Sequence, residues 1–282
     1  MFNNKIRFIS NGSQESEEVK GKFLQIASEN GFAEANEDES AIVVFAIGGD
    51  GCFLRSVHKN NFRTESYYIG YNTGHVGFLQ DDKFNEEVFV KFLSSIPQIY
   101  TMPNIIEDLF EVTKMNMLSI SIKAERDGNI FYVEKNAVND IEVSNNTRKI
   151  FKADLFLNGT ILESFFGDAI LISSPTGSTA HSMNAGGAVI LEDLPVMQLT
   201  PIQSARSNLF KNLINPMITS KVIRIVPSDI CYTQIDGMEL DEVKLDEIKE
   251  IRVSIGERYI NRVHLNSSSN KIETIKAKFL WE

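Results

Sequence analysis

Apolar residues recur with two different periods along this chain, and the change of period divides the sequence into two parts. In the first part, short apolar runs alternate with stretches whose apolar residues recur every three or four positions, as on one face of a helix. The expected strands cover residues 5–10, 41–47 and 67–71, and the expected helix faces lie at residues 19–27, 53–58 and 84–93. Strands that alternate with helices are typical of a parallel sheet. We therefore expect a doubly wound α/β domain up to about Pro103.

From Ile105 onward the pattern changes to short segments in which apolar and polar residues alternate, as in strands with one buried face. The expected strand segments are MLSISIK, NIFYVEK, AVNDIEV, ADLFL, TILES, AILIS, VIRIV, CYTQI, IRVSI and RVHL. Asn158-Gly159, between two of these segments, is a strong signal for a type I′ hairpin turn. The second domain is therefore expected to be strand-rich. The predicted architecture is α/β plus all-β, with domains at residues 1–103 and 104–273.

Composition and charge narrow the classes of function. The 282 residues are 43% hydrophobic and 23% charged, which is ordinary for a soluble globular protein. The net charge of −10 argues against nucleic acid or an anionic membrane as a partner, and no apolar run approaches a membrane span in length. Two distant cysteines, Cys52 and Cys231, without a leader sequence favour the reducing cytoplasm. The four scattered histidines give no zinc spacing.

A Gly-Gly-Asp-Gly turn, formed by Gly48, Gly49, Asp50 and Gly51, joins a buried apolar strand to a helix. Such a turn aims backbone N–H groups and a helix N-terminus above the carboxyl end of the strand, where they favour phosphate. A carboxylate repels phosphates, so we interpret Asp50 as the group that addresses a substrate hydroxyl beside a bound phosphate. The spacing matches neither the dinucleotide fingerprint nor the P-loop. The alternative is a plain strand-to-helix turn with Asp50 as N-cap.

Two further polar clusters interrupt the apolar segments of the second part. Asn139-Asp140 lies in the strand-like run 137–143, where it either holds ribose hydroxyls or forms a strand end that faces solvent. Pro175-Thr176-Gly177-Ser178 follows the segment AILIS, and Ser178 or Thr179 is expected to cap a short helix. That environment suits a carboxamide or hydroxyl-bearing ligand, and an ordinary polar turn is the alternative. The absence of a Gly-x-Ser-x-Gly elbow argues against a serine hydrolase.

Four motifs follow one another in the chain: GGDGCFLRSVH from Gly48, NTGHVGF from Asn72, NAVNDIEV from Asn136 and GDAILISSPTGSTAHSMNAGGAVI from Gly167. Together they resemble the NAD kinase family, in its small Gram-positive bacterial type, from about Ala41 to about Gly237. The last motif is the most specific, whereas the Gly-Gly-Asp-Gly loop is shared with diacylglycerol, sphingosine and phosphofructo-kinases. The resemblance implies transfer of a phosphoryl group from ATP, as its Mg²⁺ complex, to the 2′-hydroxyl of the adenosine ribose of NAD, which gives NADP.

The resemblance also implies a set of site residues. Asp50 is expected to be catalytic, because it orients and deprotonates the hydroxyl, and no residue is predicted to bind a metal ion directly. Phe78 is expected to stack or pack on the adenine base, and Asp168 to reach the nicotinamide end. The residues expected to bind the substrates are Gly48, Gly49, Gly51, Arg55, Asn72, Gly74, Phe78, Asn139, Asp140, Asp168, Ser178, Thr179, Ala180, His181, Ser182 and Asn184.

The resemblance further implies a tetramer whose neighbouring subunits complete the NAD site. It also implies inorganic polyphosphate as a second phosphoryl donor and a return of residues 274–282 to the first domain. Three positions depart from the family pattern: Cys52 replaces Thr, Asp140 replaces Glu and His181 replaces Tyr. These departures favour, as an alternative, a non-catalytic NAD-binding sensor. A lipid kinase is a second alternative, against which the acidic charge and the Pro-Thr-Gly-Ser-Thr-Ala block argue. Asp236-Gly237 matches a family Asp-Gly, and a hairpin turn explains it equally well.

Overall fold

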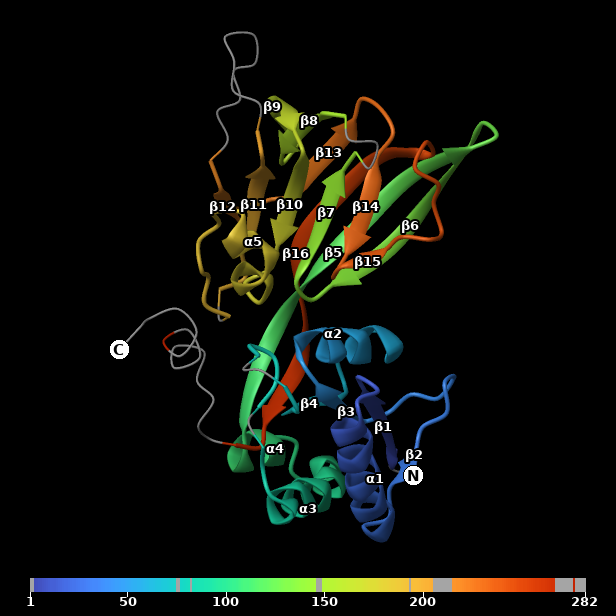
Figure 1. Cartoon of the computed structure of the whole chain (residues 1–282), viewed down its shortest axis with the longest axis vertical. Coiled ribbons are helices and arrows are strands. Elements are labelled where there is room, and N and C mark those ends of the chain that lie inside the picture. Colours follow the sequence, from blue (N-terminus) through green and yellow to red (C-terminus); the bar gives the residue numbers. More distant parts are fainter. Residues whose placement is uncertain are drawn as a thin grey trace. The chain divides into compact units, whose positions relative to one another are not determined.

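The computed structural model describes residues 3–74, 77–81, 83–145, 149–192, 194–204, 215–266 and 276. The chain divides into two units, Met1–Lys114 with Ile260–Glu282, and Met115–Tyr259 (Figure 1). Two long strands, β5 (Glu111–Arg126) and β16 (Ile248–His264), have residues in both units. The domain limits that the sequence analysis places at residues 103 and 273 remain predictions. The expected return of residues 274–282 lies, apart from Lys276, outside the described residues.

The first unit is a parallel sheet with helices on both faces, which confirms the predicted doubly wound α/β domain. Its strands pair in the order β2-β1-β3-β4, and each of these pairings is parallel. Asn261 and Arg262 of β16 extend the sheet by pairing in parallel with Tyr67 and Tyr68. The elements in chain order are β1 (Lys5–Ser10), α1 (Gln14–Glu29), β2 (Ala33–Glu34), β3 (Val43–Gly48), α2 (Asp50–Lys59), β4 (Tyr67–Asn72), α3 (Glu86–Ser95), the 3₁₀-helix η1 (Ile96–Tyr100) and α4 (Ile105–Leu109).

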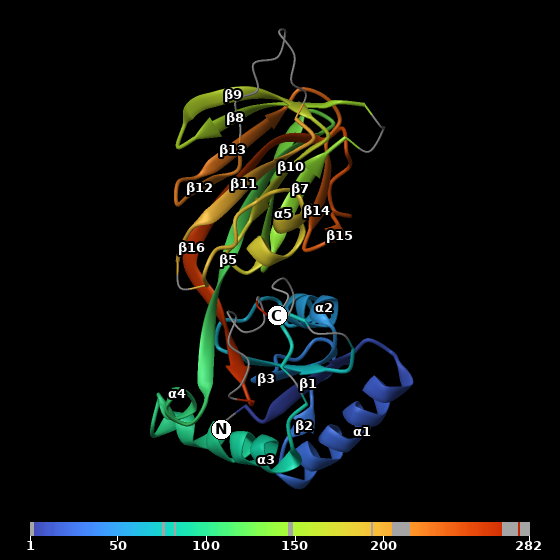
Figure 2. The same ribbon diagram turned by 60° about the vertical axis from the view of Figure 1, so that its left-hand side comes forward.

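The alternating side chains of β4 show which helices cover which face of this sheet. Tyr67, Ile69 and Tyr71 belong to one buried cluster with apolar residues of α1 and α3. Tyr68 points the other way and meets Phe53 of α2, with 6.4 Å between the ring centroids. α2 therefore covers the face opposite to α1 and α3, as Figure 2 shows. The aromatic residues at the centre of the cluster that contains Tyr67, Ile69 and Tyr71 are Phe23, Phe45, Phe84 and Phe89.

Short polar side chains fix where two helices of this unit begin. The Ser13 hydroxyl accepts the N–H group of Ser16 at the start of α1, and the Asn85 side chain accepts that of Val88 at the start of α3. Gly31 follows the end of α1 with a φ of +83°, a backbone conformation that favours glycine.

The second unit is built from antiparallel strands, which confirms the predicted strand-rich domain. One six-stranded sheet has the order β12-β11-β10-β7-β14-β15, and the other strands belong to the sheet that contains β5, β6, β8, β9, β13 and β16. Buried residues of both groups, among them Ile120, Ile141 and Ile172, form one core. The elements are β6 (Asn129–Ala137), β7 (Asp140–Ser144), β8 (Phe151–Leu157), β9 (Thr160–Gly167), β10 (Ala169–Ser173), the 3₁₀-helix η2 (Gly177–Thr179), α5 (His181–Asn184), β11 (Met197–Ile202), β12 (Met217–Thr219), β13 (Ile223–Pro227), β14 (Tyr232–Ile235) and β15 (Met238–Glu239).

Turn residues determine the hairpins of the second unit. Asn158 and Gly159 connect β8 to β9 with φ angles of +49° and +85°, which confirms the predicted type I′ turn. Asp236 and Gly237 connect β14 to β15 with φ angles of +51° and +74°. The segments IRVSI and RVHL, expected as separate strands, belong, except for Leu265, to the single strand β16, because the residues between them contain no turn-forming pair and the strand continues through Gly256.

Candidate functional site

The strand order of the first unit contains a topological switch point. The chain leaves β1 toward β2 and then returns to the other side of β1 to form β3 and β4. Ligands of open α/β sheets bind outside the carboxyl ends of the strands at such a point. The loops that follow β1, β3 and β4 therefore form the candidate site of this unit.

The glycine turn after β3 brings the backbone close to the end of β1. Gly48 has a φ of +150°, and a Cβ atom there would lie 3.0 Å from the Cβ atoms of Asn11 and Cys52. Gly49 is the N-cap of α2, and Asp50 is its first residue. The alternative interpretation of Asp50 as an N-capping residue is therefore wrong, because its side chain makes no cap and is used elsewhere.

The Asp50 carboxylate is held by the loop that follows β4. Its Oδ2 atom accepts the N–H group of Phe78 and its Oδ1 atom accepts that of Leu79, both at 2.9 Å. Gly77 makes room for this contact, since a Cβ atom there would lie 2.2 Å from Asp50 Oδ1. Gln80 adds a hydrogen bond from its Nε2 atom to the carbonyl of Gly49 at 2.9 Å. The carboxylate is thus fixed in orientation, and each oxygen keeps acceptor capacity for a hydroxyl group.

Two neighbours of Asp50 on α2 face in different directions. Cys52 is buried, and its sulfur contacts the carbonyl groups of Ile9 and Ile47 at 3.4 and 3.3 Å. Burial raises the pKa of this thiol. The residue that departs from the family pattern here thus faces the interior. Arg55 is exposed on α2 and lies beside Gly51, where a Cβ atom would be 3.6 Å from its Nη1 atom.

The loop after β4 is folded by local contacts. The Asn72 side chain accepts the N–H group of Gly74 at 2.9 Å, and Thr73 shares a hydrogen bond of 2.7 Å with Ser16 of α1. Phe78 is half-buried and Gly74 is exposed. The structure therefore brings Asn72, Gly74 and Phe78 to the same end of the sheet as Asp50. His75 and Val76 of this motif lie outside the described residues.

In the second unit, the Asp236 carboxylate organises the chain between β6 and β7. Its oxygens accept three consecutive N–H groups, those of Val138 at 2.9 Å, Asn139 at 2.7 Å and Asp140 at 3.1 Å. Asp236 is itself placed by the β14–β15 hairpin. The hairpin interpretation of Asp236-Gly237 is thus confirmed, and the side chain has a second role that the turn signal did not reveal.

The Pro-Thr-Gly-Ser-Thr block folds directly against this strand end. The carbonyl of Asn139 accepts the N–H group of Ser174 at 2.8 Å, and a Cβ atom on Gly177 would lie 2.1 Å from the same carbonyl oxygen. Three buried side-chain oxygens in this region have no hydrogen-bond partner among the described residues: Asn139 Oδ1, Ser173 Oγ and Thr176 Oγ1. Such oxygens fit a ligand that carries hydroxyl or amide groups.

The carboxyl group of Asp140 lies near the carboxylates of Asp236 and Glu142. Burial raises the pKa of Asp140 to about 7, and the negative charges of Asp236 and Glu142 act in the same direction. The side chain is only 8% exposed. Asp140 therefore changes its charge close to neutral pH, which is unusual for a carboxyl group.

The hydroxyl groups that follow are used within the protein. Ser178 donates to the carbonyl of Pro175 at 2.6 Å, Thr179 to that of Thr176 at 3.2 Å, and Ser182 accepts from the Gln198 side chain at 2.6 Å. Neither Ser178 nor Thr179 caps a helix: Ala180 is the N-cap of α5 and makes no side-chain bond. The capping prediction is therefore wrong, because the buried hydroxyls bond back to the preceding turn instead.

The remaining predicted residues of this unit are divided between two places. His181 Nδ1 lies 3.3 Å from Glu142 Oε2, and Ala180 and Asn184 lie beside it at the two ends of α5. Asp168 is exposed and precedes β10, whereas Asp140 pairs with Ser173 at the other end of that strand. Five strand residues correspond to about 17 Å. Within one chain, the structure does not bring Asp168 together with the other predicted residues.

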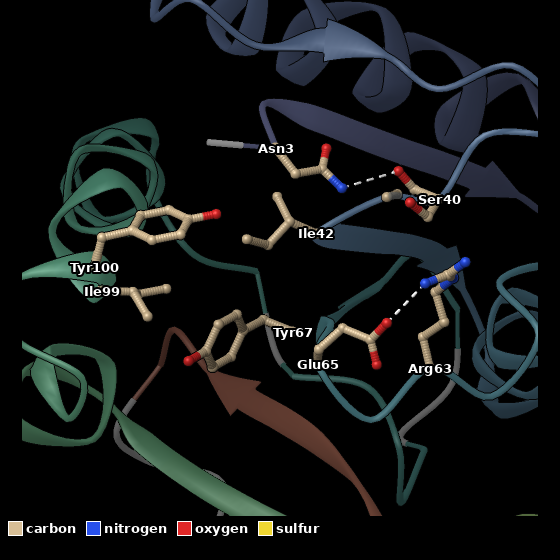
Figure 3. Close-up of a pocket in the computed structure, with 9 residues that line it drawn as sticks. Asn3, Ser40, Ile42, Arg63, Glu65, Tyr67, Ile99 and Tyr100 are labelled. Carbon is tan, nitrogen blue, oxygen red and sulfur yellow. Dashed lines mark hydrogen bonds and ion pairs between the residues drawn. The ribbon is translucent and has the colours of Figure 1, made fainter. Parts of the chain in front are cut away.

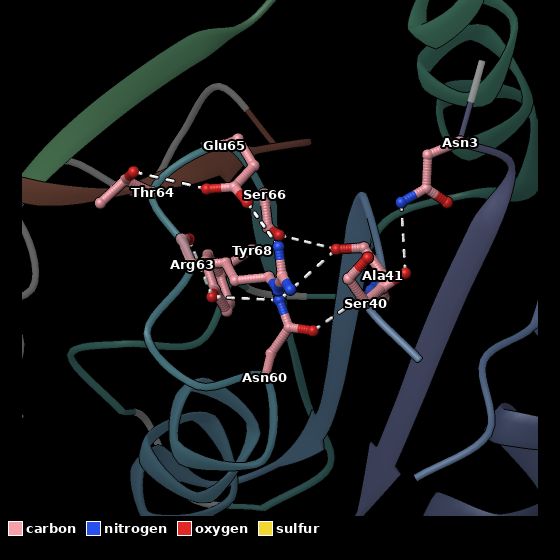
Figure 4. A network of polar contacts seen from close by, with 9 residues as sticks. All are labelled: Asn3, Ser40, Ala41, Asn60, Arg63, Thr64, Glu65, Ser66 and Tyr68. Carbon is pink, nitrogen blue, oxygen red and sulfur yellow. Dashed lines mark hydrogen bonds and ion pairs between the residues drawn. The ribbon is translucent and has the colours of Figure 1, made fainter. Parts of the chain in front are cut away.

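A separate cavity of about 270 Å³ lies at the amino ends of β3 and β4, opposite to Asp50, between Tyr67, Tyr100, Ile42 and Ile99 (Figure 3). Beside it, the buried Asn60 side chain donates to Ser66 at 2.9 Å and to Tyr68 at 3.2 Å, and it accepts the N–H group of Ala41 at 3.3 Å (Figure 4). None of the predicted site residues lines this cavity.

The described residues contain no group of three or more His, Cys, Asp or Glu side chains placed to hold a metal ion. Among their helices, none has the length and apolar character required to cross a membrane.

Comparisons with known proteins agree with one another. The model of the ATP-NAD kinase C-terminal domain matches residues 139–265. The chain is 29% identical over 272 residues to NAD kinase 2 of Bacillus licheniformis. The aligned region covers 94% of each of the two proteins.

Two solved structures show the fold. The structure of yeast NADH kinase complexed with NADH matches 99% of this chain and 87% of that chain at 20% identity, with a TM-score of 0.76. The structure of an NAD kinase from Archaeoglobus fulgidus in complex with ATP matches 96% of this chain and 99% of that chain at 18% identity, with a TM-score of 0.64.

Proposed function

Because this chain belongs to the NAD kinase family, we propose that it transfers a phosphoryl group from ATP to the 2′-hydroxyl of the adenosine ribose of NAD and thereby makes NADP. The observation that carries this proposal is the Asp50 carboxylate, which lies at the first residue of a helix above the switch point of the sheet and is fixed by two N–H groups. A carboxylate in that place is available to a hydroxyl group beside the phosphates of a nucleotide.

In the proposed reaction, Asp50 accepts a hydrogen bond from the 2′-hydroxyl and takes its proton as the hydroxyl oxygen bonds to the γ-phosphorus of ATP. The bond from that phosphorus to the β-phosphate oxygen breaks, and ADP leaves. Phosphoryl transfer proceeds through loose transition states, so that positioning and charge neutralisation provide most of the rate. The backbone N–H groups at the start of α2, together with the exposed Arg55, are placed to stabilise the phosphates.

The polar groups of the second unit suit the NAD molecule. The Asp140 carboxylate and the unpartnered Oδ1 atom of Asn139 are oxygen acceptors for ribose hydroxyls or for the N–H groups of the carboxamide. Because the hydroxyls of Ser178, Thr179 and Ser182 are engaged within the protein, we propose that this block shapes the pocket and supplies backbone groups to the ligand.

The donor set fits a Mg²⁺ ion that arrives with the phosphates of ATP. Mg²⁺ prefers octahedral oxygen coordination, keeps several waters and uses few protein ligands in phosphate-transfer sites. The described residues offer no carboxylate cluster, and both oxygens of Asp50 already accept N–H groups. When bound, the ion neutralises charge on the transferred group.

We further propose a homotetramer in the cytoplasm. The place of Asp168, at the end of β10 remote from Asp140, supports a site that a neighbouring subunit completes. The two free cysteines suit a reducing compartment. Inorganic polyphosphate remains a second possible donor.

The test is NADP formation by the purified protein with NAD, ATP and Mg²⁺, measured with an NADP-dependent dehydrogenase. We expect turnover in the natural protein and a fall of about 10²- to 10⁴-fold in D50N, because the general base is lost. The matched control is D38N, the same change at an exposed acid of the same unit, which should leave kcat unchanged. NAD binding without NADP formation in the natural protein would support the sensor alternative instead.

A further inference from the structure

A buried ionic cluster in the first unit has no part in the function described so far. It consists of Asp81, Arg262 and His264, which are 0%, 4% and 5% exposed. Burying charges costs free energy unless each one is paired and hydrogen-bonded, and replacing such a cluster by apolar residues is often no less stable. A buried cluster of this kind therefore requires an explanation beyond stability.

The contacts within the cluster join two segments that are far apart in the sequence. The Asp81 Oδ1 atom accepts Arg262 Nη2 at 2.9 Å and lies 3.0 Å from His264 Nδ1. Its Oδ2 atom accepts the N–H group of Leu265 at 3.0 Å. On the other side, His264 Nε2 lies 2.8 Å from the hydroxyl of Thr113. Asp81 thus fastens the end of the loop after β4 to β16.

Arg262 makes one further contact that leads to Asp50. Its Nη1 atom donates to the carbonyl oxygen of Phe78 at 2.8 Å. The N–H group of that same residue donates to Asp50 Oδ2 at 2.9 Å. The peptide groups at Phe78 are therefore held on one side by the guanidinium and on the other side by the carboxylate.

We propose that Arg262, held in place by Asp81, is a positioning residue that aims the Phe78 and Leu79 N–H groups at the Asp50 carboxylate. The inference rests on the proposed function, in which Asp50 is the catalytic base. In this proposal Arg262 contacts neither the Asp50 carboxylate nor the substrate. It acts through the main chain of Phe78. Its planar guanidinium fork presents two N–H groups at once, one to Asp81 and one to Phe78.

A lysine at position 262 would not reproduce both hydrogen bonds of the arginine. A lysine ammonium keeps the charge opposite Asp81, but it is a compact point charge on a flexible chain and does not reproduce the planar fork. Without the bond from residue 262, the Phe78 carbonyl loses a charge-assisted hydrogen bond, and the direction of the two N–H groups is held less firmly. A misplacement of about 1 Å in a catalytic group lowers the rate about 10²-fold.

The decisive variant is R262K. We expect kcat to fall about 10- to 100-fold, while the KM values for NAD and ATP change by less than about 3-fold, because the substrate contacts are untouched. The matched control is T113V, which removes a hydroxyl group on the other side of the same cluster. We expect T113V to lower the melting temperature without lowering kcat, since Thr113 makes no contact with Phe78 or Asp50 among its described bonds.

A double-mutant cycle separates positioning from general stability. If Arg262 acts through Asp50, R262K in the D50N background lowers the residual kcat by less than about 2-fold. A kcat of R262K equal to that of the natural protein overturns the inference, and so does a full 10- to 100-fold effect in the D50N background. Because the natural protein is assayed in parallel, its lack of turnover contradicts the proposed function and is distinguishable from both results.

Should R262K fail to fold, D81N supplies the second measurement. Its amide oxygen still accepts a hydrogen bond from Arg262, but the charge that holds the guanidinium is gone. We expect a fall in kcat of about 3- to 10-fold at an unchanged KM. An unchanged kcat in D81N contradicts the inference.

Discussion

The Asp236 carboxylate accepts the backbone N–H group of Asp140 at 3.1 Å, so that one acidic residue holds the main chain of another. The same carboxylate also accepts the two preceding N–H groups. Its charge makes ionisation of the Asp140 side chain harder, in addition to the effect of burial. The fold thus fixes the position of Asp140 with a group that opposes the charge of Asp140.

NAD binding should consequently depend on pH around neutrality. The pKa of Asp140 is raised to about 7, so its carboxyl group is mostly neutral at pH 6 and mostly ionised at pH 8. The ionised group accepts two hydroxyl hydrogen bonds, and NAD affinity should therefore rise about tenfold between these pH values. Titration calorimetry checks this. D140N should show no such rise, and a wild-type affinity that is flat across the range would contradict the assignment.

The same pKa shift predicts a stability effect with a definite sign. Since the folded pKa is raised above the ordinary value of 3.8, ionisation of Asp140 destabilises the fold progressively as the pH rises from about 4 to about 7. D140N should therefore raise the free energy of unfolding at pH 8 and leave it nearly unchanged at pH 4. Urea unfolding at both pH values measures the difference. D229N, the same change at an exposed acid of the same unit, is the matched control in both measurements.

Gly77 should tolerate no side chain. The Cβ atom of G77A would lie 2.2 Å from Asp50 Oδ1, so the loop or the carboxylate must move. We expect kcat to fall at least about 10²-fold in a protein that still folds, as judged by circular dichroism. G21A is the control: Gly21 lies within α1 with open space around its Cβ position, and alanine there should stabilise the helix slightly. Full activity in G77A would contradict the described contact.

Asn60 should matter for stability and not for catalysis. Its side chain satisfies buried polar groups at the end of the sheet opposite to Asp50. N60A removes these three hydrogen bonds and the acceptor of the buried Ala41 N–H group, while Ser66 and Tyr68 keep their bonds to the carbonyl groups of Ala41 and Arg63. We expect the free energy of unfolding to fall by about 2–3 kcal/mol. The kcat of the folded enzyme should be unchanged. T64A, which removes a hydroxyl bonded at 3.5 Å to the exposed Glu65, should change stability little in the same denaturant experiment.

The parts of the site that depend on local sequence were predictable. The apolar run before Gly48 and the helical spacing after Gly51 placed Asp50 between strand and helix, where the structure has it. The Asn158-Gly159 hairpin likewise follows from two adjacent residues. In both cases the backbone conformation is set by neighbours in the chain, so pattern and structure agree.

The parts that depend on contacts between distant residues were not predictable. Asp81 and Arg262 are 181 positions apart, and nothing in either segment marks the partner. The expected caps at Ser178 and Thr179 failed for the same reason: whether a buried hydroxyl bonds to the next turn or the previous one depends on what packs around it. For Asp236, the hairpin signal was visible and the target of the carboxylate was not.

The buried sulfur beside the catalytic turn has a chemical consequence. Oxidants and alkylating reagents attack the thiolate form of cysteine, and they need access to it. Cys52 is only 2% exposed, and burial raises the pKa of its thiol. Cys52, which directly follows Gly51, is therefore expected to react slowly with peroxide, so that the turn around Asp50 carries a sulfur atom that is shielded from oxidation.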